Sequence, residues 1–315
     1  MRQLYPPLQA NRTWELGVTE PHVIYVEECG NPDGAAVIFL HGGPGKGCNE
    51  RHRRYFDPDR YRIVIFDQRG SRRSMPRGCT VENTTHGLIA DMELIRSTLD
   101  IDRWLIYGGS WGAALGLLYT EKYPERVTGM ILRGTFLARR RDLDWFSREG
   151  VGRLLPDHWE KFISQVPPGQ KNDPVTAYYY MVHNGDDRTR LAAAKAWYEW
   201  SGRVVSYLMT EGTMYNEPDD TILNEVSIET HYAQHRYFIE EDQILLNSHR
   251  IPDVPVMIIH GRRDLTCTLD ASWKLHRALP GSELTIVPNG GHLAGEDVLI
   301  DALVGATDKM KDLLT

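Results

Sequence analysis

The sequence predicts an α/β fold in which an all-helical segment interrupts a mostly parallel central sheet. Short continuous apolar runs recur along the chain, which is typical of strands buried on both faces, and stretches with helical spacing lie between them. From about residue 139 to residue 250 these runs stop, and aromatic-rich helical stretches replace them. We therefore expect a core formed by residues 1–138 and 251–315, with residues 139–250 inserted as a helical cap.

Five strands are expected before the cap, at residues 23–28, 36–40, 63–66, 104–107 and 127–132. The first alternates along its length, whereas residues 36–40 form a continuous apolar run. Residues 84–99 place Leu88, Met92 and Ile95 on one face, which predicts an amphipathic helix. Small residues after position 112 predict a second helix, which Pro124 ends. After the cap we expect two further strands and two helices, at residues 256–259, 284–287, 269–279 and 298–314.

The composition is that of an ordinary globular protein, with 41% hydrophobic and 25% charged residues in a chain of 315. A formal net charge of -7 argues against a nucleic-acid partner. No apolar run approaches membrane-spanning length, and residues 1–7 carry no apolar signal segment. We therefore expect neither a membrane anchor nor a secretion signal, while the oligomeric state stays open.

The cysteines and histidines show no metal-site pattern. The four cysteines lie far apart without a C-x-x-C spacing, and no H-E-x-x-H motif is present. His231 and His235 are four residues apart but have no carboxylate partner at a recognisable spacing. We expect no metal and no cofactor, and the cysteine usage fits a reducing, cytoplasmic setting.

Residues 108–112 have the form G-x-S-x-G between an expected strand and an expected helix. In this context the motif predicts a sharp turn that exposes the hydroxyl of Ser110. The backbone N–H of Trp111 then lies at a helix N-terminus, where negative charge is favoured. A second loop, His-Gly-Gly-Pro-Gly at residues 41–45, follows another buried strand. The N–H of Gly43 is expected to complete an oxyanion site with that of Trp111.

Asp264 and His292 also follow expected strands, in the chain order Ser, Asp, His. Because parallel strands end at the same edge of a sheet, Ser110, Asp264 and His292 are expected to meet there. The imidazole of His292 would remove the proton from the serine hydroxyl, and Asp264 would orient the imidazole. The sequence therefore predicts a serine hydrolase of the α/β-hydrolase type.

The chain resembles the proline iminopeptidases, which are prolyl aminopeptidases of serine peptidase family S33. The resemblance covers nearly the whole chain, cap included. The segments that carry it are residues 41–45, 66–70, 108–112, 132–134, 143–146, 193–197, 228–232 and 261–264. It implies the release of an N-terminal residue, typically proline, from a small peptide or amino-acyl amide.

The resemblance also implies that two glutamates of the cap bind the free amine of the substrate. Glu229 matches one of them, whereas Ser201 stands at the position of the other. Phe136 and Phe146 match positions that line the ring pocket, and Arg133 lies at the matching base of the cap.

Ser201 leaves two alternatives open at the level of sequence. Either Glu199 or another carboxylate substitutes for the expected glutamate, or the substrate has changed to a specialised amide, an ester or a lactone. A non-catalytic receptor on the same fold is a third class, which the complete Ser, Asp and His set disfavours.

Overall fold

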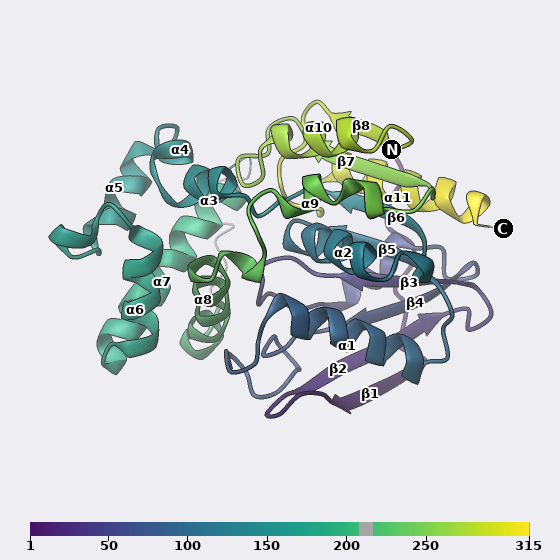
Figure 1. Cartoon of the computed structure of the whole chain (residues 1–315), viewed down its shortest axis with the longest axis horizontal. Coiled ribbons are helices and arrows are strands. Elements are labelled where there is room, and N and C mark those ends of the chain that lie inside the picture. Colours follow the sequence, from purple (N-terminus) through teal and green to yellow (C-terminus); the bar gives the residue numbers. More distant parts are fainter. Residues whose placement is uncertain (208–216, 315) are drawn as a thin grey trace.

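The computed structural model describes residues 1–207 and 217–314. Its centre is a single sheet with the strand order β1-β2-β4-β3-β5-β6-β7-β8 (Figure 1). The pairs β1–β2 and β2–β4 are antiparallel, and the other pairs are parallel, which confirms the expected mostly parallel sheet. The strands are β1 (Arg12–Gly17), β2 (Val23–Gly30), β3 (Ala35–Leu40), β4 (Tyr61–Phe66), β5 (Trp104–Gly109), β6 (Val127–Arg133), β7 (Val256–Gly261) and β8 (Glu283–Val287).

β1 is the strand that the sequence pattern did not predict. It lies at the edge of the sheet and pairs with β2, with Trp14 opposite Val26. No residue of β1 is fully buried. An edge strand with one solvated face carries few apolar side chains, so its pattern in the sequence is weak. The signal in the sequence is therefore limited to Trp14 and Leu16.

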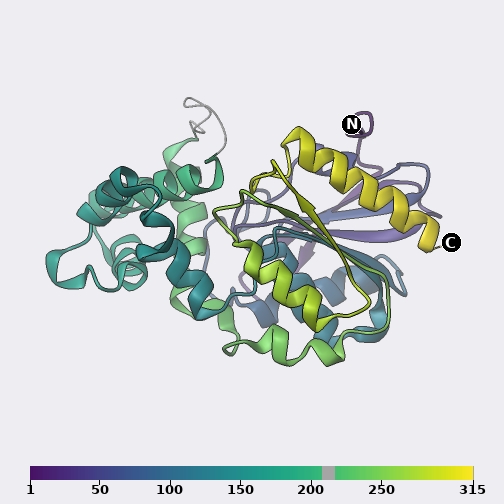
Figure 2. The ribbon, with the colours of Figure 1, turned by 90° about the horizontal axis from the view of Figure 1, so that it is seen from above.

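Helices cover both faces of the sheet, which explains the continuous apolar runs in its central strands. α1 (Thr85–Thr98), α2 (Trp111–Lys122) and α10 (Leu269–Ala278) contribute to one core cluster, whereas α11 (Asp297–Leu313) contributes to a second cluster on the opposite face. Figure 2 shows α11, in yellow, on its own side of the sheet. These helices lie where the sequence predicts them, within about two residues at each end.

Between β6 and β7 the chain forms helices, and most of them make a separate lobe beside the sheet (Figure 1). Phe162 and Tyr178 stack in its centre with ring centroids 4.5 Å apart, next to Trp197 and Trp200. These aromatic residues form a core for the lobe, as the sequence suggested. The helices are α3 (Arg140–Ser147), α4 (Glu149–Gly152), α5 (Pro156–Ser164), α6 (Pro174–Asn184), α7 (Asp187–Val205), α8 (Asp219–Gln234) and α9 (Gln243–Leu246).

α9 packs differently from the helices that precede it. It contacts α2 and α10, and its Ile244 belongs to the core cluster of the sheet. The chain has therefore returned to the sheet before residue 250. The division of the chain into a core and a cap at residues 138 and 250 stays a prediction.

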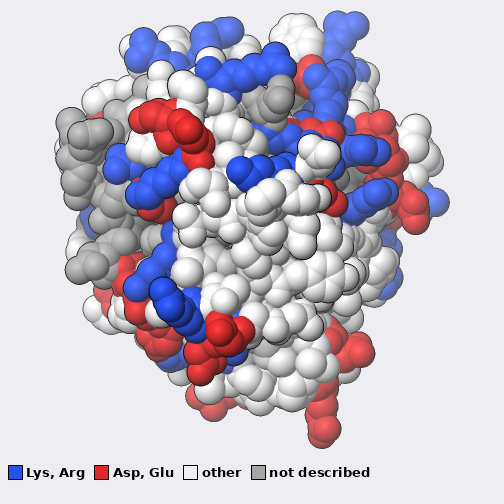
Figure 3. All heavy atoms as spheres, turned by 90° about the vertical axis from the view of Figure 1, so that its left-hand side faces the viewer, with Lys and Arg blue, Asp and Glu red and all other residues white. Residues whose placement is uncertain are grey.

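The surface of the lobe carries charges of both signs. Figure 3 shows lysine, arginine, aspartate and glutamate side chains around a broad uncharged area on this end of the molecule. No helix within residues 1–207 and 217–314 is long and apolar enough to cross a bilayer.

Candidate active site

Ser110 lies on a strained turn between β5 and α2. Its backbone has φ 56° and ψ -122°, a conformation that costs energy for any residue with a side chain. The glycines around it are required by close packing. A Cβ on Gly108 would overlap the carbonyl group of Gly112, and one on Gly112 would overlap the carbonyl oxygen of Leu40. The turn therefore passes directly against the end of β3 and presents the serine at the sheet edge.

Trp111 begins α2 and is completely buried. As the first residue of the helix, it has no intrahelical acceptor for its backbone N–H, so this donor is free to point at an anion beside Ser110. Its indole Nε1 donates to Gln68 Oε1 at 2.9 Å. The start of α2 is thereby tied to the loop that follows β4.

Gln68 also holds the glycine-rich loop that follows β3. Its backbone N–H donates to His41 Nε2 at 3.0 Å, and its side-chain amide donates to the His41 carbonyl at 2.9 Å. His41 Nδ1 then carries the proton and donates to the carbonyl of Gly42 at 2.8 Å. Burial keeps the pKa of His41 low, which favours this neutral tautomer. Gly43, with φ 114°, follows in a conformation that favours glycine.

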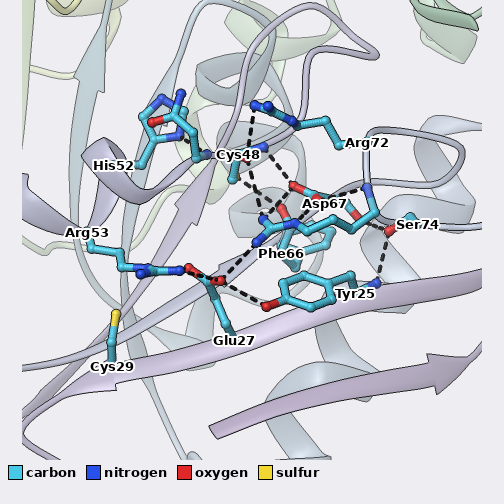
Figure 4. Close-up of polar contacts among 12 residues, drawn as sticks. Tyr25, Glu27, Cys29, Cys48, His52, Arg53, Phe66, Asp67, Arg72 and Ser74 are labelled. Atoms are coloured by element: carbon cyan, nitrogen blue, oxygen red, sulfur yellow. Dashed lines mark hydrogen bonds and ion pairs between the residues drawn. The ribbon is translucent and has the colours of Figure 1, made fainter. Parts of the chain in front are cut away.

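A buried ion network supports the same loop from below (Figure 4). Asp67 accepts the backbone N–H of Cys48 at 2.7 Å and pairs with Arg73 Nε at 2.6 Å. Arg73 also reaches Glu27 at 3.0 Å, and Arg53 binds Glu27 with two hydrogen bonds of 2.7 and 2.9 Å. The Asp-Gln-Arg-Gly segment thus positions residues 41–48 through Asp67 and Gln68.

Asp264 and His292 form a hydrogen-bonded pair at the same edge of the sheet. His292 Nδ1 lies 2.7 Å from Asp264 Oδ2. The other carboxylate oxygen accepts the backbone N–H groups of Thr266 and Cys267, each at 2.9 Å. Burial alone would raise the pKa of Asp264, but His292 and these donors hold it below its ordinary value. The carboxylate therefore stays ionised beside the imidazole.

The backbone around His292 is fixed from several sides. Glu296 accepts the N–H of Gly291 at 2.7 Å and that of Leu293 at 3.2 Å. Arg133 Nη1 donates to the carbonyl of His292 at 2.5 Å. Arg133 was expected at the base of the cap as a substrate-binding residue, and it lines the cavity there. Its guanidinium also packs against Gly109, where a Cβ would overlap it.

A cavity of about 600 Å³ opens above these residues and extends under the lobe. The Ser110 hydroxyl lies 3.8 Å from Cys267 Sγ. Asp264 and Trp111 do not line the cavity and lie behind it. The predicted site residues that line it are Gly43, Ser110, Arg133, Phe136, Phe146, Ser201, Glu229 and His292.

Glu229 on α8 supplies a carboxylate to the cap end of this cavity. Its Oε2 accepts the indole N–H of Trp197 at 2.8 Å, and its side chain is only 11% exposed. Burial raises the pKa of Glu229 even though the nearby Lys46 opposes that effect. Ser201 on α7 lines the same cavity, whereas Glu199 pairs with Lys161 at 2.6 Å in a separate surface hollow. Glu199 therefore does not substitute for the expected glutamate.

The sequence analysis did not single out several residues that line the cavity or support the candidate catalytic residues. Lys46 and Glu225 line the cavity and form an ion pair of 2.6 Å. A weak signal existed for both, since Lys46 lies three residues after Gly43 and Glu225 lies four residues before Glu229, one helical turn away. Glu296 had no comparable signal, because its carboxylate accepts the N–H groups of Gly291 and Leu293 and does not cap the helix that it precedes. The bridging role of Gln68 depends on tertiary contacts alone.

The comparisons with known proteins agree with this geometry. The family model of the alpha/beta hydrolase fold matches residues 35–297. The proline iminopeptidase of Xylella fastidiosa (strain Temecula1) is 46% identical over 310 residues, which cover 98% of this chain and 99% of that protein. The proline iminopeptidase of Arabidopsis thaliana is 41% identical over 317 residues, covering 99% of this chain and 83% of that protein.

Solved structures with low sequence identity share the fold. An esterase from Rhodococcus superposes with a TM-score of 0.59 at 15% identity, covering 98% of this chain and all of that one (100%). A proline iminopeptidase-related protein from Thermus thermophilus superposes with a TM-score of 0.57 at 20% identity, covering 96% of each chain. The near-complete coverage at more than 40% identity decides the family, and this chain belongs to the proline iminopeptidases of the α/β-hydrolase fold.

Proposed function

We propose that this protein is a serine aminopeptidase that releases N-terminal proline, or a small N-terminal residue, from short peptides and amino-acyl amides. The observation that carries the proposal is the cavity itself. It joins Ser110, on its strained turn, and the 2.7 Å His292–Asp264 pair to the buried carboxylate of Glu229. The first group of residues supplies acyl-transfer chemistry, and Glu229 supplies an anionic contact for a free N-terminus.

In the acylation step, Ser110 Oγ attacks the carbonyl carbon of the N-terminal residue while His292 takes the hydroxyl proton. Asp264 holds the imidazole by its Nδ1 and stabilises the imidazolium that forms. The N–H groups of Gly43 and Trp111 receive the oxyanion, and each such donor is worth about 3 kcal/mol in the transition state. The imidazolium then gives its proton to the leaving amine, and the C–N bond breaks.

In the deacylation step, a water molecule takes the place of the leaving peptide. His292 removes a proton from this water as the oxygen attacks the acyl-enzyme ester, and the oxyanion again forms between the same two donors. Collapse of the intermediate returns the proton to Ser110 Oγ and releases the free amino acid. The reaction needs no group beyond these side chains and water.

Recognition of the substrate is assigned to the cap end of the cavity. A carboxylate held by Trp197 and largely removed from solvent attracts the charged amine more strongly than an exposed one would. Phe136 and Phe146, which line the same cavity, offer apolar surface to a small ring. The alternative of an ester, lactone or specialised amide, which Ser201 suggested, is not favoured by the proline iminopeptidase relatives.

A cytoplasmic location is part of this proposal. The four cysteines are free thiols, and Cys29, Cys48 and Cys267 are buried. Unpaired thiols persist in a reducing compartment such as the cytoplasm. The oligomeric state stays open.

The test is hydrolysis of prolyl and alanyl arylamides by the wild type and by Ser110→Ala. We expect kcat/KM to fall at least about a thousandfold in the variant, because the nucleophile is lost. Ser164→Ala, which alters an exposed serine on α5, is the matched control. A fluorophosphonate should label the wild type and not Ser110→Ala. Retained hydrolysis in Ser110→Ala, or equal turnover of free and N-acetylated substrates by the wild type, would contradict the proposal.

A further inference from the structure

The amine end of the cavity already holds an ammonium group of the protein. Lys46 extends from the glycine-rich loop of the core to α8 of the lobe. Its Nζ lies 2.6 Å from Glu225 Oε2 and 3.9 Å from Glu229 Oε1. The Tyr198 ring lies 4.5 Å from the same nitrogen, as in a cation–π contact.

The two carboxylates differ in how they are bound. Glu225 binds Lys46 through Oε2 at hydrogen-bond distance, whereas Glu229 binds Trp197 through Oε2 and makes no hydrogen bond to Lys46. Glu229 Oε1 faces Lys46 across 3.9 Å, which is beyond a hydrogen bond. This oxygen therefore keeps its capacity to accept a donor from a molecule in the cavity.

The charges in this group are unequal. Glu225 and Glu229 carry two negative charges, and Lys46 neutralises one of them, because the carboxylates hold its pKa above the ordinary value despite partial burial. A substrate ammonium bound at Glu229 Oε1 would lie next to the Lys46 ammonium. Repulsion between like charges a few ångströms apart is substantial in a partly desolvated site.

We propose that Lys46 is a specificity residue that competes with the substrate amine for the carboxylates of α8, with Glu225 present as its counter-ion. Lys46 weakens binding of every cationic N-terminus, and only a ligand that also gains contacts with the ring-binding wall binds well. In this arrangement Glu225 binds Lys46 and does not bind the substrate amine in place of the glutamate expected at position 201. The inference rests on the proposed function, since it concerns the amine subsite of that reaction.

The test measures binding rather than turnover, in a Ser110→Ala background that prevents hydrolysis. Two ligands of the same size are compared by calorimetry: prolinamide, which carries the ammonium, and cyclopentanecarboxamide, which lacks it. Lys46→Met keeps an unbranched side chain that is one atom shorter and removes its charge. The quantity compared is the dissociation constant of prolinamide divided by that of cyclopentanecarboxamide. We expect this ratio to be roughly tenfold lower in the variant than in the parent.

Glu225→Gln provides an independent variant with the opposite expected sign. Without its counter-ion, the Lys46 ammonium should move closer to Glu229. It would then repel the ammonium of prolinamide more strongly, so the dissociation constant of prolinamide should rise. Lys161→Met is the matched control, because it removes an ion pair of the same 2.6 Å length outside the cavity. It should leave both ligands unaffected.

Two results would overturn the inference. If Lys46→Met bound prolinamide as the parent does, Lys46 would not compete; if it bound prolinamide more weakly, Lys46 would contact the substrate directly. Failure of the proposed function has a separate signature, namely no hydrolysis of prolyl arylamides by the protein with Ser110 intact. The two failures are therefore distinguishable.

Discussion

Single residues around His292 hold the backbone of this candidate general base in place. Glu296 accepts N–H groups on both sides of the histidine, at 2.7 and 3.2 Å, and Arg133 binds its carbonyl. Gly134, with φ 52°, leaves room for the pair, since a Cβ there would lie 3.2 Å from Asp264 Oδ2. Glu296 and Arg133 bind backbone groups at and beside His292, and we propose that they act as positioning residues for its imidazole.

Replacing Glu296 with glutamine should reduce kcat about tenfold with a small change in KM, because the amide retains one acceptor and loses the other. The measurement is steady-state hydrolysis of a prolyl arylamide, with Glu283→Gln as the control on the exposed ion pair with Lys309. Glu296→Asp, which restores the carboxylate at shorter reach, should recover part of kcat. A rise in KM alone would assign Glu296 to substrate binding instead.

At the scale of the element, α8 joins the lobe to the core. It carries Glu225 and Glu229 toward the cavity and then enters the core with its last turn. There His231 Nε2 lies 3.0 Å from the carbonyl of Asn83, and the hydroxyl of Tyr232 donates to the Asn83 side chain at 3.0 Å. His183 and His235 lie next to His231 with ring centroids 6.4 and 4.7 Å away.

Protonation of His231 should destabilise the fold in mild acid. Burial, with the neighbouring histidines, lowers its pKa from 6.5 to about 4. In the unfolded chain the group binds a proton near pH 6.5, so the unfolded state binds more protons between pH 6.5 and 4. The free energy of unfolding therefore falls as the pH drops through this window, by roughly 2–3 kcal/mol for this group.

The measurement is urea unfolding of the wild type and His231→Gln at several pH values. Glutamine keeps a donor near the Nε2 position but does not titrate. The stability advantage of the wild type should shrink from pH 7 to pH 4. A difference between the two proteins that does not vary with pH would assign the acid sensitivity to other groups.

At the scale of the whole molecule, one network of charged and polar side chains connects the sheet to the loops that carry the expected oxyanion donors. Glu27 on β2 and Asp67 after β4 bind Arg53 and Arg73, and Asp67 holds the backbone of Cys48. Gln68, the next residue, bridges His41 and Trp111. The two expected oxyanion donors therefore lie on segments that share one buried support.

Asp67→Asn should be destabilising, because it removes a completely buried carboxylate that pairs with Arg73, whose side chain is 32% exposed. Arg73 keeps its contact with Glu27, so the cost should be about 2–3 kcal/mol, below that of breaking a fully buried pair. Urea unfolding measures the effect, and Asp102→Asn, in an exposed pair with Arg126, should change stability by less than about 1 kcal/mol. Equal effects of the two substitutions would show that the network contributes no more than a surface pair.

The sequence by itself determined the sheet except for its edge strand β1, the helices that cover the sheet, and the positions of the candidate catalytic residues along the chain. Buried parallel strands and amphipathic helices leave local periodic patterns, and the turn at Ser110 needs glycines that are visible in the sequence. The sequence also placed Asp264 and His292 after strands, and the parallel sheet brings them within 2.7 Å. The edge strand β1 was missed because its solvated face leaves only a weak pattern.

Only the tertiary structure decided which charged groups meet in the cavity. Lys46 and Glu225 are 179 residues apart, yet they pair at 2.6 Å because the lobe folds over the glycine-rich loop. Packing of α5 against α7 within the lobe pairs Glu199 with Lys161, whereas Ser201 lies at the wall of the cavity. Local sequence sets backbone conformation, but long-range ion pairs depend on how separate elements pack. The candidate catalytic residues therefore follow from motifs in the sequence, whereas the charged groups beside Glu229 depend on tertiary packing.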